Sequence, residues 1–144
     1  MTEPWILIVE DNIDDANMIV RALAENKREE VPAICADASQ ALDLLNRSET
    51  LPKLVLLDGR LPGMESHVFL EMLRQTEGTR FLPVVLFSGH SYPKSVHIAL
   101  TAGANSYVCK PLDFDGMLEH LGTTFHYWLD VHHHAQPVNW RVQK

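Results

Sequence analysis

The chain has 144 residues, of which 46% are hydrophobic and 22% are charged, and its formal net charge is −7 at pH 7. That length suits one domain with a substantial core, and the acidic charge argues against nucleic acid or an anionic membrane as the main partner. No apolar run approaches the roughly 20 residues of a membrane-spanning helix, and the N-terminal segment lacks the basic flank of a signal peptide.

The N-terminal part of the chain predicts a strand followed by a helix. Residues 5–9, WILIV, form a continuous aliphatic run that is typical of a strand buried on both faces. From Asp15 to about Asn26, apolar residues recur at the spacing of an amphipathic helix. Either Asp14 or Asp15 could cap its first turn, where a carboxylate meets the positive end of the helix dipole.

The rest of the chain alternates in the same way, and this predicts an α/β fold. Gly103 is expected to stop one helix and Asp113 to cap the last one. Alternation with short connections predicts a flavodoxin-like, doubly wound parallel sheet with strand order 2-1-3-4-5. The remaining predicted strands cover 31–36, 54–57, 83–87 and 106–109, and the helices cover 38–47 (with Ser39 as a candidate cap), 65–76, 94–102 and 113–131.

We expect residues 1–131 to form this domain, including the extended last helix, and residues 132–144 to form a tail. Cys35 and Cys109 lie in apolar, strand-like runs, which predicts buried, reduced thiols in a cytoplasmic protein rather than a disulfide. No stretch after the last predicted helix has the pattern of a DNA-binding or catalytic output domain. We therefore expect the output to be binding to another protein.

Polar residues follow the predicted strands at the points where these strands end. Because the carboxyl ends of parallel strands meet at one edge of the sheet, we expect these side chains to converge. Three crowded carboxylates need a counter-charge, and Mg²⁺ prefers such oxygen ligands; Mn²⁺ would fit them too. This arrangement suits phosphoryl transfer, with Asp58 as the nucleophile. The converging residues are Glu10, Asp11, Asp58, Ser88 and Lys110.

Four segments that contain these residues, ILIVEDN, LVLLDGRLP, VVLFSG and YVCKP, resemble the receiver domain of two-component response regulators. The resemblance implies that Asp58 accepts a phosphoryl group from a histidine kinase. Glu10, Asp11, Asp58 and the main-chain carbonyl of Arg60 would hold Mg²⁺. Ser88 and Lys110 would bind the phosphoryl oxygens.

The resemblance also implies a conformational switch and marks several departures from the family pattern. Tyr107 would turn inward as Ser88 moves towards the phosphate, although plain packing is an alternative for Tyr107. Lys110–Pro111 would form a cis peptide bond. Arg60 and His90 stand at positions that tune the loss of the phosphoryl group. Two departures are Ser66, which replaces a usual glycine and could alter the entry to its helix, and Gly59, which replaces a usual aliphatic residue.

The family resemblance makes a stand-alone signalling phosphoacceptor, rather than an enzyme with another substrate, the main hypothesis. The segment FHYWLDVHH is similar to regulators partnered with phytochrome-type histidine kinases, which form homodimers through their helix 4, strand 5 and helix 5 face and the C-terminal extension. The alternative for the tail is that it folds back on its own domain. The run His132, His133 and His134 is interpreted as a solvated helix end rather than a metal site.

Two rival functions come from other classes of protein. One is a pseudo-receiver, an interaction module that never carries phosphate. The other is a flavodoxin-like enzyme or an Asp-x-Asp phosphatase, which Arg60 argues against because it stands where the second aspartate would be.

Overall fold

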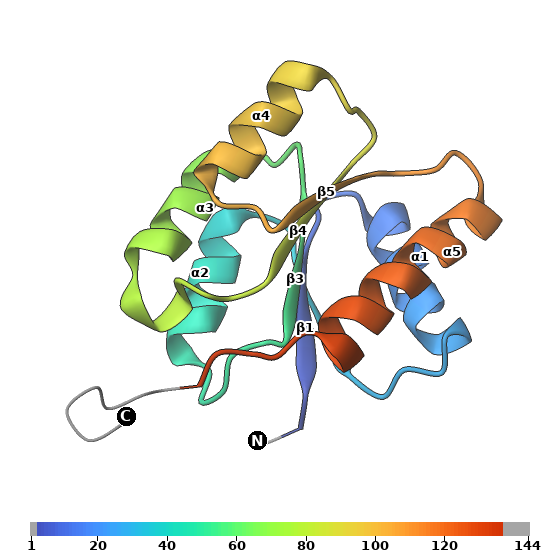
Figure 1. The fold of residues 1–144 in the computed structure, drawn as a ribbon, viewed down its shortest axis with the longest axis horizontal. Helices are drawn as coiled ribbons and strands as arrows, with labels where there is room; N and C mark the ends of the chain where they lie inside the picture. Colours follow the sequence, from blue (N-terminus) through green and yellow to red (C-terminus); the bar gives the residue numbers. More distant parts are fainter. Residues whose placement is uncertain (1–2, 137–144) are drawn as a thin grey trace.

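The computed structural model describes residues 3–136, and within them five parallel strands form one sheet (Figure 1). The strand order is β2-β1-β3-β4-β5, as the alternation of strands and helices predicts. The flavodoxin-like fold is therefore confirmed. The strands are β1 (Trp5–Val9), β2 (Val31–Cys35), β3 (Leu54–Asp58), β4 (Val84–Ser88) and β5 (Ser106–Cys109).

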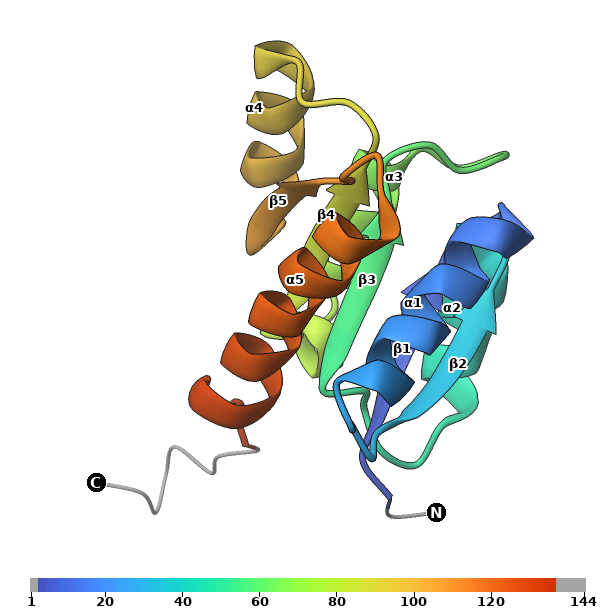
Figure 2. The same cartoon turned by 90° about the vertical axis from the view of Figure 1, so that its right-hand side faces the viewer.

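Helices cover both faces of the sheet (Figures 1 and 2). α1 and α5 pack side by side on one face, and α2, α3 and α4 cover the other. The bounds are α1 (Ile13–Glu25), α2 (Ala38–Arg47), α3 (Ser66–Gln75), α4 (Pro93–Ala102) and α5 (Phe114–Phe125), with a short 3₁₀ turn at Glu77–Thr79. None of the helices within residues 3–136 is both long and apolar enough to cross a bilayer.

The unbroken aliphatic strands divide their side chains between two cores. In β1, Leu7 and Val9 face the core under α2 and α3, while Ile6 and Ile8 face the core under α1 and α5. All four side chains are fully buried, because successive residues of a strand point to opposite faces and both faces are covered. The strand ends are thereby fixed in position.

Two of the predicted helix caps differ in the structure. Asn12, rather than Asp14 or Asp15, caps α1, and its side chain accepts a hydrogen bond from the Asp15 N–H at 3.1 Å. Asp37, rather than Ser39, caps α2 in the same way. In both cases the capping side chain precedes the first helical residue, where its oxygen can reach the free N–H groups of the first turn.

The last helix changes its hydrogen-bonding pattern before the predicted end. The α-helix ends at Phe125 and continues as a π-helical turn over His126–Val131. Beyond it, the His134 ring nitrogen Nε2 lies 2.8 Å from the Lys53 carbonyl oxygen, so this part of the tail contacts its own domain. Residues 137–144 of the predicted tail lie outside the described residues.

The two cysteines lie in different environments. Cys35 is buried as predicted, but Cys109 is exposed, and the prediction of a buried thiol there is wrong. The reason is that Cys109 is the last residue of β5, an edge strand of the sheet. Both thiols are free.

Arg74 joins the C-terminal ends of α3 and α4 to the edge of the sheet. Its guanidinium donates to the carbonyl oxygens of Gly103 at 2.9 Å and Leu82 at 2.8 Å, and to Asn105 Oδ1 at 2.9 Å. Gly103 has a φ of +116° and ends α4 as predicted, and a Cβ there would lie 2.6 Å from Arg74 Cγ. Arg74 therefore holds the C-terminal end of α4 at Gly103 and the following loop at Asn105.

Candidate functional site

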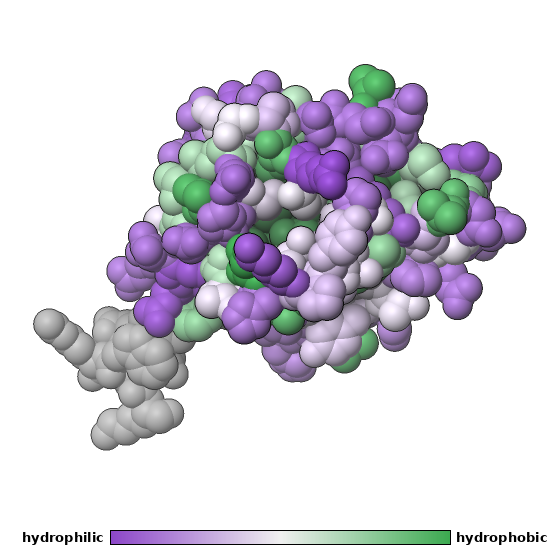
Figure 3. All heavy atoms as spheres, turned by 90° about the horizontal axis from the view of Figure 1, so that it is seen from above, coloured by the Kyte–Doolittle hydropathy of each residue, from purple (hydrophilic) through white to green (hydrophobic). Residues whose placement is uncertain are grey.

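The predicted site residues come together at the carboxyl edge of the sheet. Glu10 follows β1, Asp58 and Ser88 end β3 and β4, and Lys110 follows β5. Figure 3 looks onto this end of the molecule and shows mainly hydrophilic side chains around a hollow. The buried strands bring the polar residues here because each strand ends at the same edge.

Three carboxylates form a cluster that could hold a metal ion. One oxygen each from Glu10, Asp11 and Asp58 lies within 4.8 Å of the others. Glu10 is buried, Asp58 is half-buried and Asp11 is exposed. A set made only of carboxylate oxygens suits a hard divalent cation such as Mg²⁺, so the residues fit the predicted metal.

Burial and the neighbouring carboxylate disfavour the ionised form of Glu10. Burial, and then the neighbouring Asp58 carboxyl, raise the pKa of Glu10 to about 7. Both effects disfavour the negative charge, and a bound cation would oppose them. A divalent cation held by the cluster would therefore favour the ionised form of Glu10.

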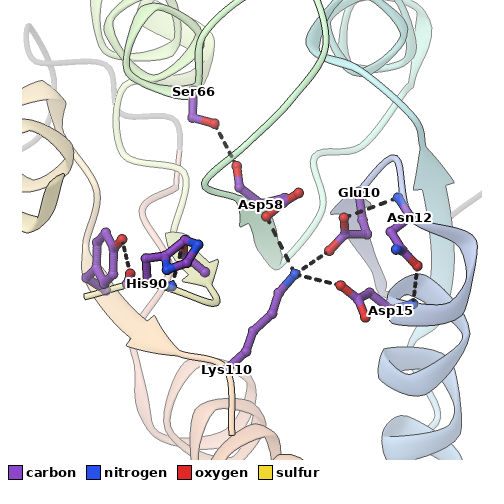
Figure 4. Close-up of polar contacts among 9 residues, drawn as sticks. Glu10, Asn12, Asp15, Asp58, Ser66, His90 and Lys110 are labelled. Atoms are coloured by element: carbon purple, nitrogen blue, oxygen red, sulfur yellow. Dashed lines mark hydrogen bonds and ion pairs between the residues drawn. The ribbon is translucent and has the colours of Figure 1, made fainter. Parts of the chain in front are cut away.

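Lys110 lies between the acidic cluster and the first turn of α1 (Figure 4). Its Nζ atom is 2.7 Å from Glu10 Oε1, 3.0 Å from Asp15 Oδ2 and 3.5 Å from Asp58 Oδ1. Although burial opposes its charge, the hydrogen bond to Glu10 and the charge of Asp58 raise the pKa of Lys110. The ammonium group is thus positive and close to the predicted phosphoacceptor.

The contact of Lys110 with Asp15 was not predicted from the sequence, in which Asp15 was interpreted as a helix cap rather than a metal ligand. The available signal was the position of Asp15 in the first turn of α1, a few residues after the acidic pair Glu10 and Asp11 that follows β1. The hydrogen bond between Lys110 and Asp15 nevertheless joins residues 95 positions apart, so it depends on how the segment after β5 and the start of α1 come together in the fold.

Ser66 secures the loop that follows Asp58. Its hydroxyl donates to the Asp58 carbonyl oxygen at 2.6 Å, and the side chain is buried at the start of α3 (Figure 4). The expected alteration at the entry to α3 therefore takes the form of an added hydrogen bond. This bond links the main chain of the predicted phosphoacceptor to α3.

Ser88 is buried at the end of β4 and packs closely against Gly59. A Cβ atom on Gly59 would lie 2.7 Å from Ser88 Oγ, which is closer than side chains approach. The Ser88 hydroxyl also accepts a hydrogen bond from the His90 N–H at 3.3 Å. The missing side chain of Gly59 thus makes room for the hydroxyl beside Asp58.

A cleft of about 450 Å³ adjoins Ser88 and separates the loop after β3 from α4. Tyr107 lines this cleft, and its hydroxyl donates to the His90 carbonyl oxygen at 2.5 Å. Arg60 and His90 line it too, and the His90 ring stacks on Tyr92 with the ring centroids 5.4 Å apart. Arg60 and His90 thus lie in the same cleft as Tyr107, the predicted switch residue. Their tuning roles, and the main-chain carbonyl of Arg60 as a metal ligand, stay predictions.

The predicted cis peptide bond is wrong. All peptide bonds in the described part of the chain are trans, including Lys110–Pro111. The trans form of an X–Pro bond is favoured by about 0.5–1 kcal/mol unless the surroundings select cis. The Lys110 N–H donates to the Ser88 carbonyl oxygen at 2.7 Å and extends the pairing of β5 with β4.

Comparisons with known proteins agree with this geometry. A family model described as the response regulator receiver domain matches residues 6–122. The Probable methanogenesis regulatory protein FilR2 of Methanothrix harundinacea is 34% identical over 128 residues, which cover 86% of this chain and 83% of that protein.

Solved structures show the same fold. The phosphorylated cyanobacterial phytochrome response regulator RcpA has a TM-score of 0.86 at 21% identity, covering 94% of this chain and 100% of that chain. The Mn²⁺-bound form of the response regulator Rcp1 has a TM-score of 0.82 at 21% identity, covering 92% and 99%. Because the family model spans the residues from Glu10 to Lys110 that form the site, the chain belongs to the response regulator receiver family.

Proposed function

We propose that the chain is a stand-alone response regulator that accepts a phosphoryl group on Asp58 from the phosphohistidine of a sensor histidine kinase. The observation that carries this proposal is the position of Asp58, which belongs to the carboxylate cluster and lies 3.5 Å from the Lys110 ammonium nitrogen. A carboxylate oxygen of Asp58 attacks the phosphorus atom, the bond from phosphorus to the histidine nitrogen breaks, and an aspartyl phosphate forms.

The surrounding residues stabilise the negative charge of the transferred group. Glu10, Asp11 and Asp58 would hold Mg²⁺, which supplies charge neutralisation for the phosphoryl oxygens. The Lys110 ammonium group, 3.5 Å from Asp58, and the Ser88 hydroxyl would bind the remaining oxygens. Mn²⁺ fits the same oxygen ligands. In this proposal the protein promotes the gain and loss of its own phosphoryl group and transforms no other substrate.

The phosphorylated state would differ in its binding surface. Ser88 moves towards the phosphoryl group, the cleft beside it changes, and Tyr107 turns into the space. The name of RcpA connects that protein with phytochrome, and we extend a phytochrome-type kinase partner to this chain as part of the proposal. The free thiols of Cys35 and Cys109 agree with a cytoplasmic setting.

A homodimer is the second part of the proposal. Exposed apolar side chains on α4 and after α5 support it, because such groups commonly mark an interface. They are Tyr92, Ile98 and Leu100 at α4 and Tyr127 and Val131 in the π-helical turn. The tail of residues 132–144 contributes to the dimer in this proposal, and its residues 137–144 lie outside the described part of the chain.

The test of the phosphoacceptor is labelling with a radioactive small phosphodonor and with a phosphorylated kinase domain. The wild type should gain a hydroxylamine-labile label that requires Mg²⁺ and disappears with a chelator. Asp58→Asn should reduce the label to background, since an amide cannot form the acyl phosphate. Asp43→Asn, which changes an exposed residue of α2, should leave labelling unchanged.

Two results would contradict the proposal. Label at the wild-type level in Asp58→Asn would assign the acceptor to another residue. A wild-type protein that neither binds Mg²⁺ nor takes label would favour the pseudo-receiver, in which the same fold only binds partners.

A further inference from the structure

Lys110 has three carboxylate neighbours, and the second nearest is Asp15 (Figure 4). Asp15 Oδ2 lies 3.0 Å from Nζ, closer than the 3.5 Å to the proposed phosphoacceptor Asp58. The Lys110 side chain is 13% exposed and that of Asp15 is 34% exposed, so the pair is partly shielded from water. Asp15 thus holds the ammonium group together with Glu10.

Asp15 differs from the other two partners because it lies outside the cluster that could hold a metal. Glu10 and Asp58 are members of that cluster, whereas Asp15 is not among its oxygen donors. A divalent cation would therefore draw on the same two carboxylates that Lys110 contacts at 2.7 Å and 3.5 Å. Asp15 is the partner of Lys110 that metal binding leaves available.

The local structure fixes Asp15 in this position. Its N–H donates to the capping side chain of Asn12 at 3.1 Å, and the N–H of Asn12 donates to Glu10 Oε2 at 3.3 Å. Asp15 therefore belongs to the first turn of α1, where the helix dipole favours a carboxylate. Its side chain reaches Lys110 from a rigid element rather than from a loop.

We propose that Asp15 is a positioning residue, which holds the Lys110 ammonium so that Glu10 and Asp58 are free to bind a divalent cation. This inference rests on the proposed function and adds a residue to it. Without Asp15, Lys110 would depend on Glu10 and Asp58 alone, and the ammonium group and the cation would compete for the same oxygens.

The first test measures Mg²⁺ affinity by calorimetry for Asp15→Asn and for its matched control Asp14→Asn. Asp14 is the preceding residue of the same turn, carries the same charge and makes no ion pair with Lys110. Asp15→Asn should weaken Mg²⁺ binding by about 2-fold to 5-fold, the range expected for a partly exposed ion pair. Asp14→Asn should weaken it less, because it removes only the distant charge.

A double-mutant cycle separates positioning from loss of charge. In a Lys110→Met background there is no ammonium group to compete, so Asp15→Asn should lose most of its effect on Mg²⁺ affinity. An undiminished effect in that background, or equal effects of the Asp14 and Asp15 variants, would overturn the proposal.

A second readout does not depend on metal binding or on activity. The ¹⁵N-resolved NMR signal of the Lys110 ammonium group should shift or broaden in Asp15→Asn and stay as in the wild type in Asp14→Asn. An unchanged signal would overturn the inference. If the wild type failed to bind Mg²⁺, the proposed function would fail, and this signal in the metal-free protein would still decide whether Asp15 positions Lys110.

Discussion

Gly59 leaves no room for a side chain next to Ser88. A Cβ atom there would lie 2.7 Å from Ser88 Oγ and 2.9 Å from Ser88 Cβ. Both atoms belong to a buried side chain at the end of a central strand, which leaves the serine little freedom to retreat. The absence of a side chain at Gly59 thus sets the position of the hydroxyl proposed to bind the phosphoryl group.

We therefore expect Gly59→Ala to lower the free energy of unfolding by about 1–3 kcal/mol, the usual cost of overpacking a buried site. Urea denaturation measures this change. Gly89→Ala is the matched control, because a Cβ at Gly89 would meet nothing within 4 Å. Equal stability of the two variants would show that Ser88 moves aside without cost.

At the level of single residues, the charged site residues at the strand ends could be predicted from the sequence. The hydrogen bonds that side chains make to other elements could not. Glu10, Asp58 and Lys110 were identifiable because a charged residue after a buried aliphatic run has few packing explanations. The bonds of Asp15 to Lys110 and of Ser66 to the Asp58 carbonyl were missed. Each bond joins two elements, and its partner depends on how those elements pack.

At the level of elements, one group of ion pairs links the π-helical turn after α5 to the segment before β2. Arg28 binds Asp130 with two bonds, at 2.8 Å and 2.9 Å, and Glu30 with two more, at 3.0 Å and 2.9 Å. Asp130 lies in the π-helical turn after α5. Bidentate arginine pairs of this kind are stronger than single surface contacts.

This contact predicts an acid-sensitive contribution to stability. The hydrogen bonds from Arg28 lower the pKa of Asp130 to about 2. Because the folded pKa is below the unfolded one, the contribution is complete above about pH 4 and is lost as the pH falls towards 2. Asp130→Asn should melt below the wild type at pH 6, and the difference in Tm should shrink towards zero at pH 2.

The control for this prediction is Glu25→Gln, which removes the exposed pair of Arg21 with Glu25 on α1. It should leave the Tm nearly unchanged at both pH values, since exposed pairs contribute little. A Tm difference for Asp130→Asn that is constant from pH 6 to pH 2 would contradict the assignment.

Element types were predicted well because the apolar period differs between strands and helices. The change from α to π geometry at His126 was not predicted, since both patterns place apolar residues on one side of the helix. The caps of α1 and α2 lie two or three residues before the predicted ones for a similar reason. Asn12 and Asp37 stand beside other polar residues that could cap as well.

At the level of the whole molecule, the proposed dimer can be tested by removing one apolar side chain. Leu100→Glu places a charge on the exposed side of α4, where burial in an interface would be costly. Sedimentation velocity with and without a phosphodonor should show a dimer of the wild type in at least one state. The same states of Leu100→Glu should be monomeric.

Leu51→Glu is the control, because Leu51 is exposed to a similar degree but lies between α2 and β3. It should dimerise as the wild type does. A monomeric wild type in both states, or a dimer that Leu100→Glu leaves intact, would contradict the proposed interface.

The strand order of the whole sheet was predictable because right-handed crossovers leave few arrangements for five alternating units. The packing of the described tail against the Lys53 carbonyl was one of two alternatives, and the sequence did not decide between them. A contact between residues so far apart in the chain depends on the complete fold.

The hydrogen bond of Arg74 to Gly103 bears on how α4 would move in the proposed phosphorylated state. It anchors the C-terminal end of α4, whereas Tyr92 begins the helix with no side-chain cap, and the hydrogen bond from Tyr107 holds the neighbouring loop at His90. A displacement of Ser88 would act on that uncapped end of α4. The helix would then pivot about Gly103, so that a shift at one hydroxyl becomes a change in the direction of the α4 axis.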